Sequence, residues 1–149
     1  ISVFLFFGLL GVLGSYYLFT KTLAWDLLLP ATACGLLATA VLNINNVRDI
    51  ETDAVSGKIT LAVRLGRNRA IAYHWLLLGA ALVSTIAFLL TQPASFWPWI
   101  FLPAMKPLTD AARTLRESYD GEVLTGALKK TAISAFLFSL LLSIGLALS

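Results

Sequence analysis

The first twenty residues contain no charged side chain, and this feature constrains the fold more than any other. An apolar segment of about 20 residues is long enough to cross the roughly 30 Å hydrocarbon core of a bilayer as an α-helix. Charged residues make up only 13% of the whole chain, about half of the share typical of a soluble domain. The sequence therefore predicts an integral membrane protein.

Four further apolar segments follow the first, and together they predict an all-α, polytopic transmembrane helical bundle of about five spans in a single domain. In the fourth segment Pro98, Pro103 and Pro107 interrupt the pattern, so we expect a kinked or tilted helix there. We expect an amphipathic surface helix to follow it over residues 108–119. We place the five spans near residues 1–20, 27–47, 70–91, 96–112 and 132–148.

Basic residues are concentrated around two loops, at residues 48–69 and 113–131. Ten of the eleven Lys and Arg side chains lie in or beside these loops. Two predicted spans separate the loops, so both lie on the same face of the membrane, and the positive-inside rule makes that face cytoplasmic. This asymmetry accounts for the net charge of +3, and we expect no nucleic-acid partner.

The start of the chain is unlike the start of a complete membrane protein. Ile1 already lies within an apolar run, and Met105 is the only methionine. Residues 1–20 also lack the basic beginning and short core of a signal peptide. We therefore expect the chain to be part of a larger protein.

The most polar stretch, residues 43–66, reads NINNVRDIETDAVSGKITLAVRLG. Its Asn45, Asp49 and Asp53 recur at four-residue intervals, so they share one face if the second span continues through them as a helix. Neighbouring carboxylates on such a face repel each other unless a positive group lies between them. Mg²⁺ prefers carboxylate oxygens and leaves part of its coordination shell to water or substrate phosphate. The spacing predicts a Mg²⁺ site formed by Asp49 and Asp53, with amide oxygens from Asn45 and Asn46.

Three cations in the same stretch are candidates for binding a diphosphate. Arg48, Lys58 and Arg64 could bind the phosphate oxygens that a metal leaves free. The alternative is a simple solvated loop between spans. The periodic acids, their continuity with an asparagine-bearing helix end, and the cations that follow Gly57 favour the binding site.

The same residues carry a resemblance to a known family. Residues 45–53, NNVRDIETD, and residues 57–66, GKITLAVRLG, resemble the second aspartate-rich region of the UbiA-type intramembrane prenyltransferases. Within that family the pattern is most similar to the branch that acts in menaquinone synthesis. The resemblance extends over the whole chain and is strongest over residues 31–66.

The resemblance implies a nine-helix all-α fold in which two aspartate-rich motifs face each other across a cavity on the cytoplasmic side. This chain would form the second half, its last five helices. The first motif is absent from these residues, so the resemblance implies that the N-terminal half of the same protein is a required partner and that this part alone is inactive. The family pattern has aspartate where Asn46 stands, which makes Asn46 a weaker metal ligand.

The activity that the resemblance implies is Mg²⁺-dependent aromatic prenyl transfer in the bacterial cytoplasmic (inner) membrane, with the active site on the cytoplasmic side. Polyprenyl diphosphate and 1,4-dihydroxy-2-naphthoate would be the substrates, and demethylmenaquinol, CO₂ and pyrophosphate the products. Asp49 and Asp53 would be the catalytic residues, because the metal they hold stabilises the leaving pyrophosphate. Arg48, Lys58 and Arg64 would bind the diphosphate.

Two other functions remain open from the residues. Another aromatic acceptor such as 4-hydroxybenzoate would require the same diphosphate site. Half of a secondary transporter is the alternative of another class, because transporters place ionisable groups within broken helices, as Lys106 and Asp110 lie within the proline-rich fourth segment. A purely structural subunit leaves the spacing of Asn45, Asp49 and Asp53 unexplained.

Overall fold

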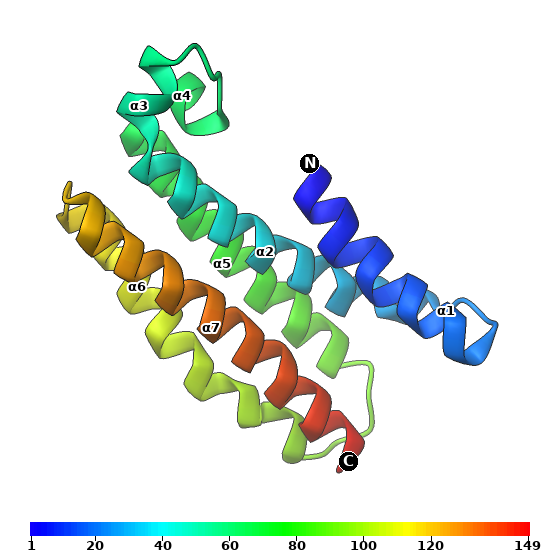
Figure 1. The fold of residues 1–149 in the computed structure, drawn as a ribbon. Coiled ribbons are helices and arrows are strands. Elements are labelled where there is room, and N and C mark those ends of the chain that lie inside the picture. Colours follow the sequence, from blue (N-terminus) through cyan, green and yellow to red (C-terminus); the bar gives the residue numbers. More distant parts are fainter.

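The computed structural model describes all of residues 1–149 and contains helices without any strand, as the sequence predicts (Figure 1). Several continuous helical segments combine two types of helix. The π-helix η1 runs into α1, and the 3-10 helices η2 and η3 run into α2 and α6. The elements are η1 (Phe4–Gly14), α1 (Ser15–Thr20), η2 (Trp25–Leu27), α2 (Leu28–Arg48), α3 (Ile50–Val55), α4 (Leu61–Leu65), α5 (Arg67–Leu89), η3 (Trp97–Ala104), α6 (Met105–Glu117) and α7 (Gly121–Ala147).

Three helices are long and apolar enough to cross a membrane: Trp25–Arg48, Arg67–Leu89 and Gly121–Ala147. They agree with the predicted second, third and fifth spans. The first predicted span forms the shorter apolar helix Phe4–Thr20. The fourth predicted span is divided between η3 and α6. The chain is an all-α membrane helical bundle in which two of the five predicted spans are shorter or less regular than the other three.

The connection expected at residues 113–131 is mostly helical. Only residues 118–120 lie outside α6 and α7, and α7 begins at residue 121 rather than at 132. The reason is local, because the Asp120 carboxylate accepts hydrogen bonds from the backbone N–H groups of Glu122 and Val123, at 2.7 and 3.3 Å. Such a cap satisfies donors that a helix start otherwise leaves free. The polar character of these residues had suggested a loop.

Helix α6 is amphipathic, as predicted, and its apolar face packs inside the bundle. Arg113 and Arg116 are exposed on its other face. Pro107 lies in the first turn of α6, where its missing N–H removes no hydrogen bond. The buried face consists of Leu108, Ala111, Ala112 and Leu115.

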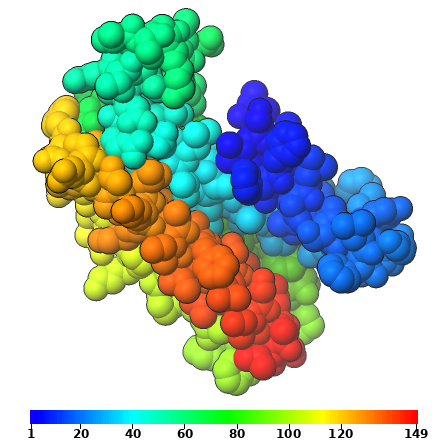
Figure 2. All heavy atoms as spheres, viewed as in Figure 1, coloured from blue at the N-terminus to red at the C-terminus, as the bar shows by residue number.

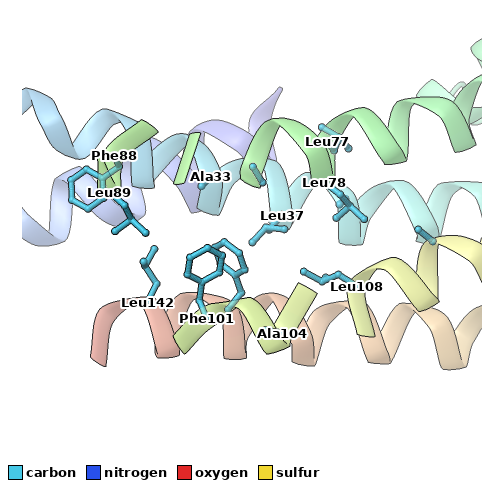
Figure 3. Close-up of a cluster of buried hydrophobic side chains, with 14 residues drawn as sticks. Ala33, Leu37, Leu77, Leu78, Phe88, Leu89, Phe101, Ala104, Leu108 and Leu142 are labelled. Atoms are coloured by element: carbon cyan, nitrogen blue, oxygen red, sulfur yellow. The ribbon is translucent and has the colours of Figure 1, made fainter. Parts of the chain in front are cut away.

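Two hydrophobic clusters hold the bundle together. The larger, with fourteen buried residues, joins α2, α5, η3, α6 and α7 (Figure 3), and Phe101 meets Phe138 edge to face with ring centroids 4.6 Å apart. The smaller cluster, which includes Ile44, Val47 and Leu115, lies at the polar end of α2. Lipid is as apolar as these side chains, so close packing stabilises such contacts more than exclusion of water does. The smaller cluster positions the segment that carries the predicted site.

Glycines allow η1 to approach α2 closely. A Cβ atom built on Gly35 would lie 2.8 Å from the backbone oxygen of Phe4 and 3.1 Å from the Cα atom of Gly8. Backbone atoms at such distances cannot move aside as a flexible side chain can. The crossing of η1 over α2 therefore depends on the absence of a side chain at Gly35.

Replacing Gly35 by alanine is expected to destabilise the protein by about 1–3 kcal/mol through overpacking. Gly79 in α5 is the matched control, because a Cβ atom built there has no neighbour within 4 Å. Gly79→Ala should be stabilising by about 0.5–1 kcal/mol, since glycine loses more backbone entropy on folding than alanine. Denaturant unfolding of the two variants in detergent measures both changes, and shifts in the same direction would contradict the close crossing.

Candidate functional site

The backbone that carries the predicted metal ligands is nearly a continuation of α2. Asp49 separates α2 from α3, but helical hydrogen bonds pass across it, from Asp49 N–H to Asn45 C=O at 3.1 Å and from Asp53 N–H to Asp49 C=O at 2.8 Å. The side-chain Nδ2 of Asn45 also donates to Oδ2 of Asp49, at 3.4 Å. The predicted continuation of the second span through this stretch is therefore confirmed. We call Asn45, Asp49 and Asp53 the acidic ladder.

Asp49 is paired with the adjacent Arg48 through two hydrogen bonds. Nε donates to Oδ1 at 2.7 Å and Nη2 donates to Oδ2 at 2.9 Å. The same guanidinium donates to Oδ1 of Asn45 at 3.0 Å and to Oγ1 of Thr125 in α7 at 3.3 Å. Hydrogen bonding by Arg48 holds the pKa of Asp49 below its ordinary value. Asp49 is therefore ionised at neutral pH, as a metal ligand must be.

Asp53 is paired with a lysine from the turn that follows. Its side chain is buried, with 6% of the residue exposed, and Nζ of Lys58 lies 3.0 and 3.1 Å from its two oxygens. The turn is possible because Gly57 adopts φ +74. The N–H of Lys58 then donates to the carbonyl of Asp53 at 2.9 Å, and the N–H of Gly57 to that of Ala54 at 3.3 Å. This arrangement is a Schellman cap, and it brings Lys58 back over the carboxylate.

The other predicted site residues form fewer side-chain hydrogen bonds and ion pairs. Asn46 is half-buried and forms no side-chain hydrogen bond, and Arg64 is exposed on α4 without an ion pair. Asn43 is instead buried and donates to the carbonyl of Ala70 at 2.9 Å, which joins α2 to the start of α5. The structure thus pairs each aspartate of the ladder with its own cation, Arg48 or Lys58. A positive group therefore lies beside each of the two carboxylates.

An apolar groove of about 740 Å³ reaches the acidic ladder. It lies between the start of the chain, α2 and α7, where Figure 2 shows α2 between the N-terminal helix and α7. Val41, Ala38 and Cys34 continue the groove along α2 from Asn45, and Phe136 contributes from α7. Sequence reasoning had assigned these residues to span interiors only. Three separate segments form the groove, so the residue pattern within any one span could not identify it.

The ladder suits a metal that is shared with a substrate. No group of three or more His, Cys, Asp or Glu side chains gathers anywhere in the structure, so the chain does not form a closed carboxylate cage. Two carboxylates one helical turn apart, Asp49 and Asp53, do occur beside the amides of Asn45 and Asn46. Mg²⁺ is usually bound by one or two carboxylates together with water and substrate phosphates. The donor set fits this kind of site.

A family model and several curated proteins match this chain. The model of the UbiA prenyltransferase family matches residues 1–122. The chain is 49% identical over 149 residues to 1,4-dihydroxy-2-naphthoate octaprenyltransferase of Escherichia coli, covering 100% of this chain and 48% of that protein. Enzymes of the same name from Haemophilus influenzae and Mycobacterium tuberculosis are 44% and 38% identical over 98% and 94% of this chain, and over 47% of each enzyme.

The chain thus spans about half the length of these curated relatives. No solved structure matches it. The match to the family model covers most of the chain and includes the whole acidic ladder with Lys58 and Arg64. The chain belongs to the UbiA prenyltransferase family.

Proposed function

We propose that the protein containing this chain transfers a polyprenyl group from polyprenyl diphosphate to 1,4-dihydroxy-2-naphthoate, with release of CO₂ and pyrophosphate and formation of demethylmenaquinol. The observation that carries the proposal is the junction between the apolar groove and the acidic ladder. Asn45 belongs to both. A ligand with an isoprenoid tail and a charged diphosphate head needs such a junction, and the names of the relatives support the same reaction.

The ladder would hold the head of the donor substrate. Asp49 and Asp53, assisted by Asn45 and Asn46, would bind Mg²⁺. When bound, Mg²⁺ neutralises the diphosphate and lowers the barrier to its departure. In the structure Arg48 and Lys58 are already hydrogen-bonded to the two aspartates, so a metal that takes over these carboxylates would free more of their donors for phosphate oxygens.

Arg64 would bind phosphate without such an exchange. It is exposed and forms no ion pair. Its planar guanidinium presents several donors to phosphate oxygens. Of the three predicted phosphate-binding cations, Arg64 is the one that is free from the outset.

The groove would orient the tail and keep water from the reacting carbon. Its lining is almost wholly apolar between Asn45 and Val3, which suits an isoprenoid chain. An allylic carbon that loses its diphosphate reacts readily with water, so a dry groove favours reaction with the naphthoate ring. Decarboxylation at the attacked ring carbon then restores aromaticity.

We also propose where the protein lies in the cell and which further part of it completes the site. We place the protein in the bacterial cytoplasmic membrane, with the acidic ladder on the cytoplasmic face. We expect the N-terminal half of the same protein to supply the first aspartate-rich motif. The 149 residues alone would then be inactive, because half of the metal ligands would be absent.

The reaction is tested with the purified protein carrying its whole natural chain. Polyprenyl diphosphate and 1,4-dihydroxy-2-naphthoate should give prenylated product, CO₂ and pyrophosphate in equal amounts, and EDTA should stop the reaction. Prenylation of 4-hydroxybenzoate but not of the naphthoate would assign the other acceptor. Substrate flux into vesicles without a covalent product would instead support the transporter.

A further inference from the structure

A second cavity, of about 660 Å³, lies behind the acidic ladder. Val47, Ile50 and Glu51 line one side of it. At about 100° per residue, Val47 and Glu51 lie on the side of the helix opposite Asp49, and Ile50 lies between the two sides. No residue of the groove or of the acidic ladder lines this cavity, so it is distinct from both, although Arg48 borders the cavity as well as the ladder.

The opposite wall of this cavity is formed by Arg67, Asn68 and Arg69, the first residues of α5. Neither arginine forms an ion pair. Glu51 is the only acid in the lining, and Arg48, a further lining residue, is already neutralised by Asp49. The cavity therefore carries an excess of positive charge.

Arg67 is held in place without any carboxylate. Its Nη2 donates to the carbonyl of Leu115 at 2.8 Å and to the carbonyl of Ser118. Its guanidinium also lies 4.1 Å from the ring centroid of Tyr119, another residue of the lining. Its Nε is buried and has no hydrogen-bond partner. A guanidinium that is already fixed by carbonyls and an aromatic ring loses little conformational freedom when an anion binds beside it.

The start of α5 adds further donors to the same wall. No side chain caps it, and no acid lies in its first turn. The first N–H groups of a helix lack partners within the helix and carry partial positive charge. Three independent features therefore favour an anion here: a cavity of sufficient volume, two arginines without acidic partners, and uncapped backbone donors.

We propose that this cavity binds a phosphate group, and that the phosphate belongs to the head group of an anionic phospholipid. Helix α5 is long and apolar enough to span the membrane and begins at Arg67, so the cavity lies at a membrane surface. Val47, Ile50 and Leu65 provide apolar wall beside the cations, which suits a glycerol ester more than a free phosphate ion. Basic pockets between membrane helices recognise such head groups.

The test compares three variants, each of which lowers the net charge by one. Asn68→Asp places an acid in the first turn of α5, where it favours the helix but repels an anion in the cavity. Lys129→Gln removes one positive charge from an exposed position on α7 that does not line the cavity. Arg69→Gln is a second cavity variant, since Arg69 is exposed and has no protein partner.

The delipidated full-length protein is titrated with dioleoylphosphatidylglycerol, dioleoylphosphatidylcholine and inorganic pyrophosphate, and binding is measured by native mass spectrometry. Phosphatidylglycerol should bind in preference to phosphatidylcholine. Asn68→Asp and Arg69→Gln should each weaken its binding about tenfold, the loss expected for one charge-assisted contact, whereas Lys129→Gln should change it less than about twofold.

The other possible outcomes show whether the proposed lipid or the proposed anion site itself is wrong. Pyrophosphate binding that is weakened by the two cavity variants, without selective binding of phosphatidylglycerol, would retain the anion site and overturn the lipid as its ligand. Equal loss in Asn68→Asp and Lys129→Gln, or equal binding of the two lipids and no pyrophosphate binding, would overturn the site. Loss of lipid binding in Asp53→Asn would also overturn it, because the ligand would then lie at the ladder.

Discussion

Asp49→Asn and Asp53→Asn are each expected to lower prenyl transfer by more than about 100-fold. Each substitution removes a carboxylate that the proposed metal needs and leaves the side chain nearly unchanged in size. Even residues that only support metal ligands cost about 10–100-fold when they are replaced. The amide can still accept a hydrogen bond from Arg48 or Lys58, so the local fold should persist. Turnover of the full-length protein at saturating Mg²⁺ measures the effect.

Glu117→Gln is the control for this loss of charge. Glu117 is an exposed acid at the end of α6 and takes no part in the proposed site, so its replacement should leave turnover unchanged. Thermal unfolding of all three variants checks that the fold is intact. Near-normal Mg²⁺-dependent turnover in either aspartate variant would contradict the role given to that residue.

Lys58→Gln is expected to change the binding of metal and of diphosphate in opposite directions. Nζ of Lys58 lies on both oxygens of Asp53, where it competes with a metal. Without substrate, Mg²⁺ should therefore bind roughly two- to fivefold more tightly to the variant, the size expected for a partly exposed ion pair. With the lysine gone, a polyprenyl thiodiphosphate analogue should bind about tenfold more weakly, because one charged donor to phosphate is lost.

Isothermal titration of the full-length protein with Mg²⁺ alone, and with the analogue at saturating Mg²⁺, measures the two affinities separately. Lys106→Gln is the matched control, since Lys106 is exposed and forms no ion pair. If Lys58→Gln leaves the affinity for Mg²⁺ alone unchanged, the lysine does not compete with the metal at Asp53. If the affinity for the analogue is unchanged, Lys58 does not bind the diphosphate.

The opposite effects follow from how the structure satisfies its acids. Arg48 and Lys58 occupy the carboxylates that the metal would use, so a metal that displaces them frees more of their donors for phosphate. Metal and diphosphate should therefore each strengthen the binding of the other, as reciprocal linkage requires.

Local features of the sequence were sufficient to predict much of this protein. Apolar runs predict the membrane helices, because a span must be apolar along its whole length. The four-residue spacing of Asn45, Asp49 and Asp53 predicts a shared face, because this depends on backbone geometry within a few residues. The start of α7 also depends on neighbouring residues, because Asp120 caps it, and the sequence alone contains this cap. Polarity misled the prediction there.

Tertiary structure decided which distant segments meet at the charged groups. Lys58 meets Asp53 through the local turn at Gly57, but the guanidinium of Arg48 also bonds to Thr125 of α7, 77 positions away. The groove requires η1 and α7 to lie beside α2, and the basic cavity requires Tyr119 to lie beside the start of α5. Such contacts between distant segments depend on how whole helices pack, which no spacing within one segment encodes.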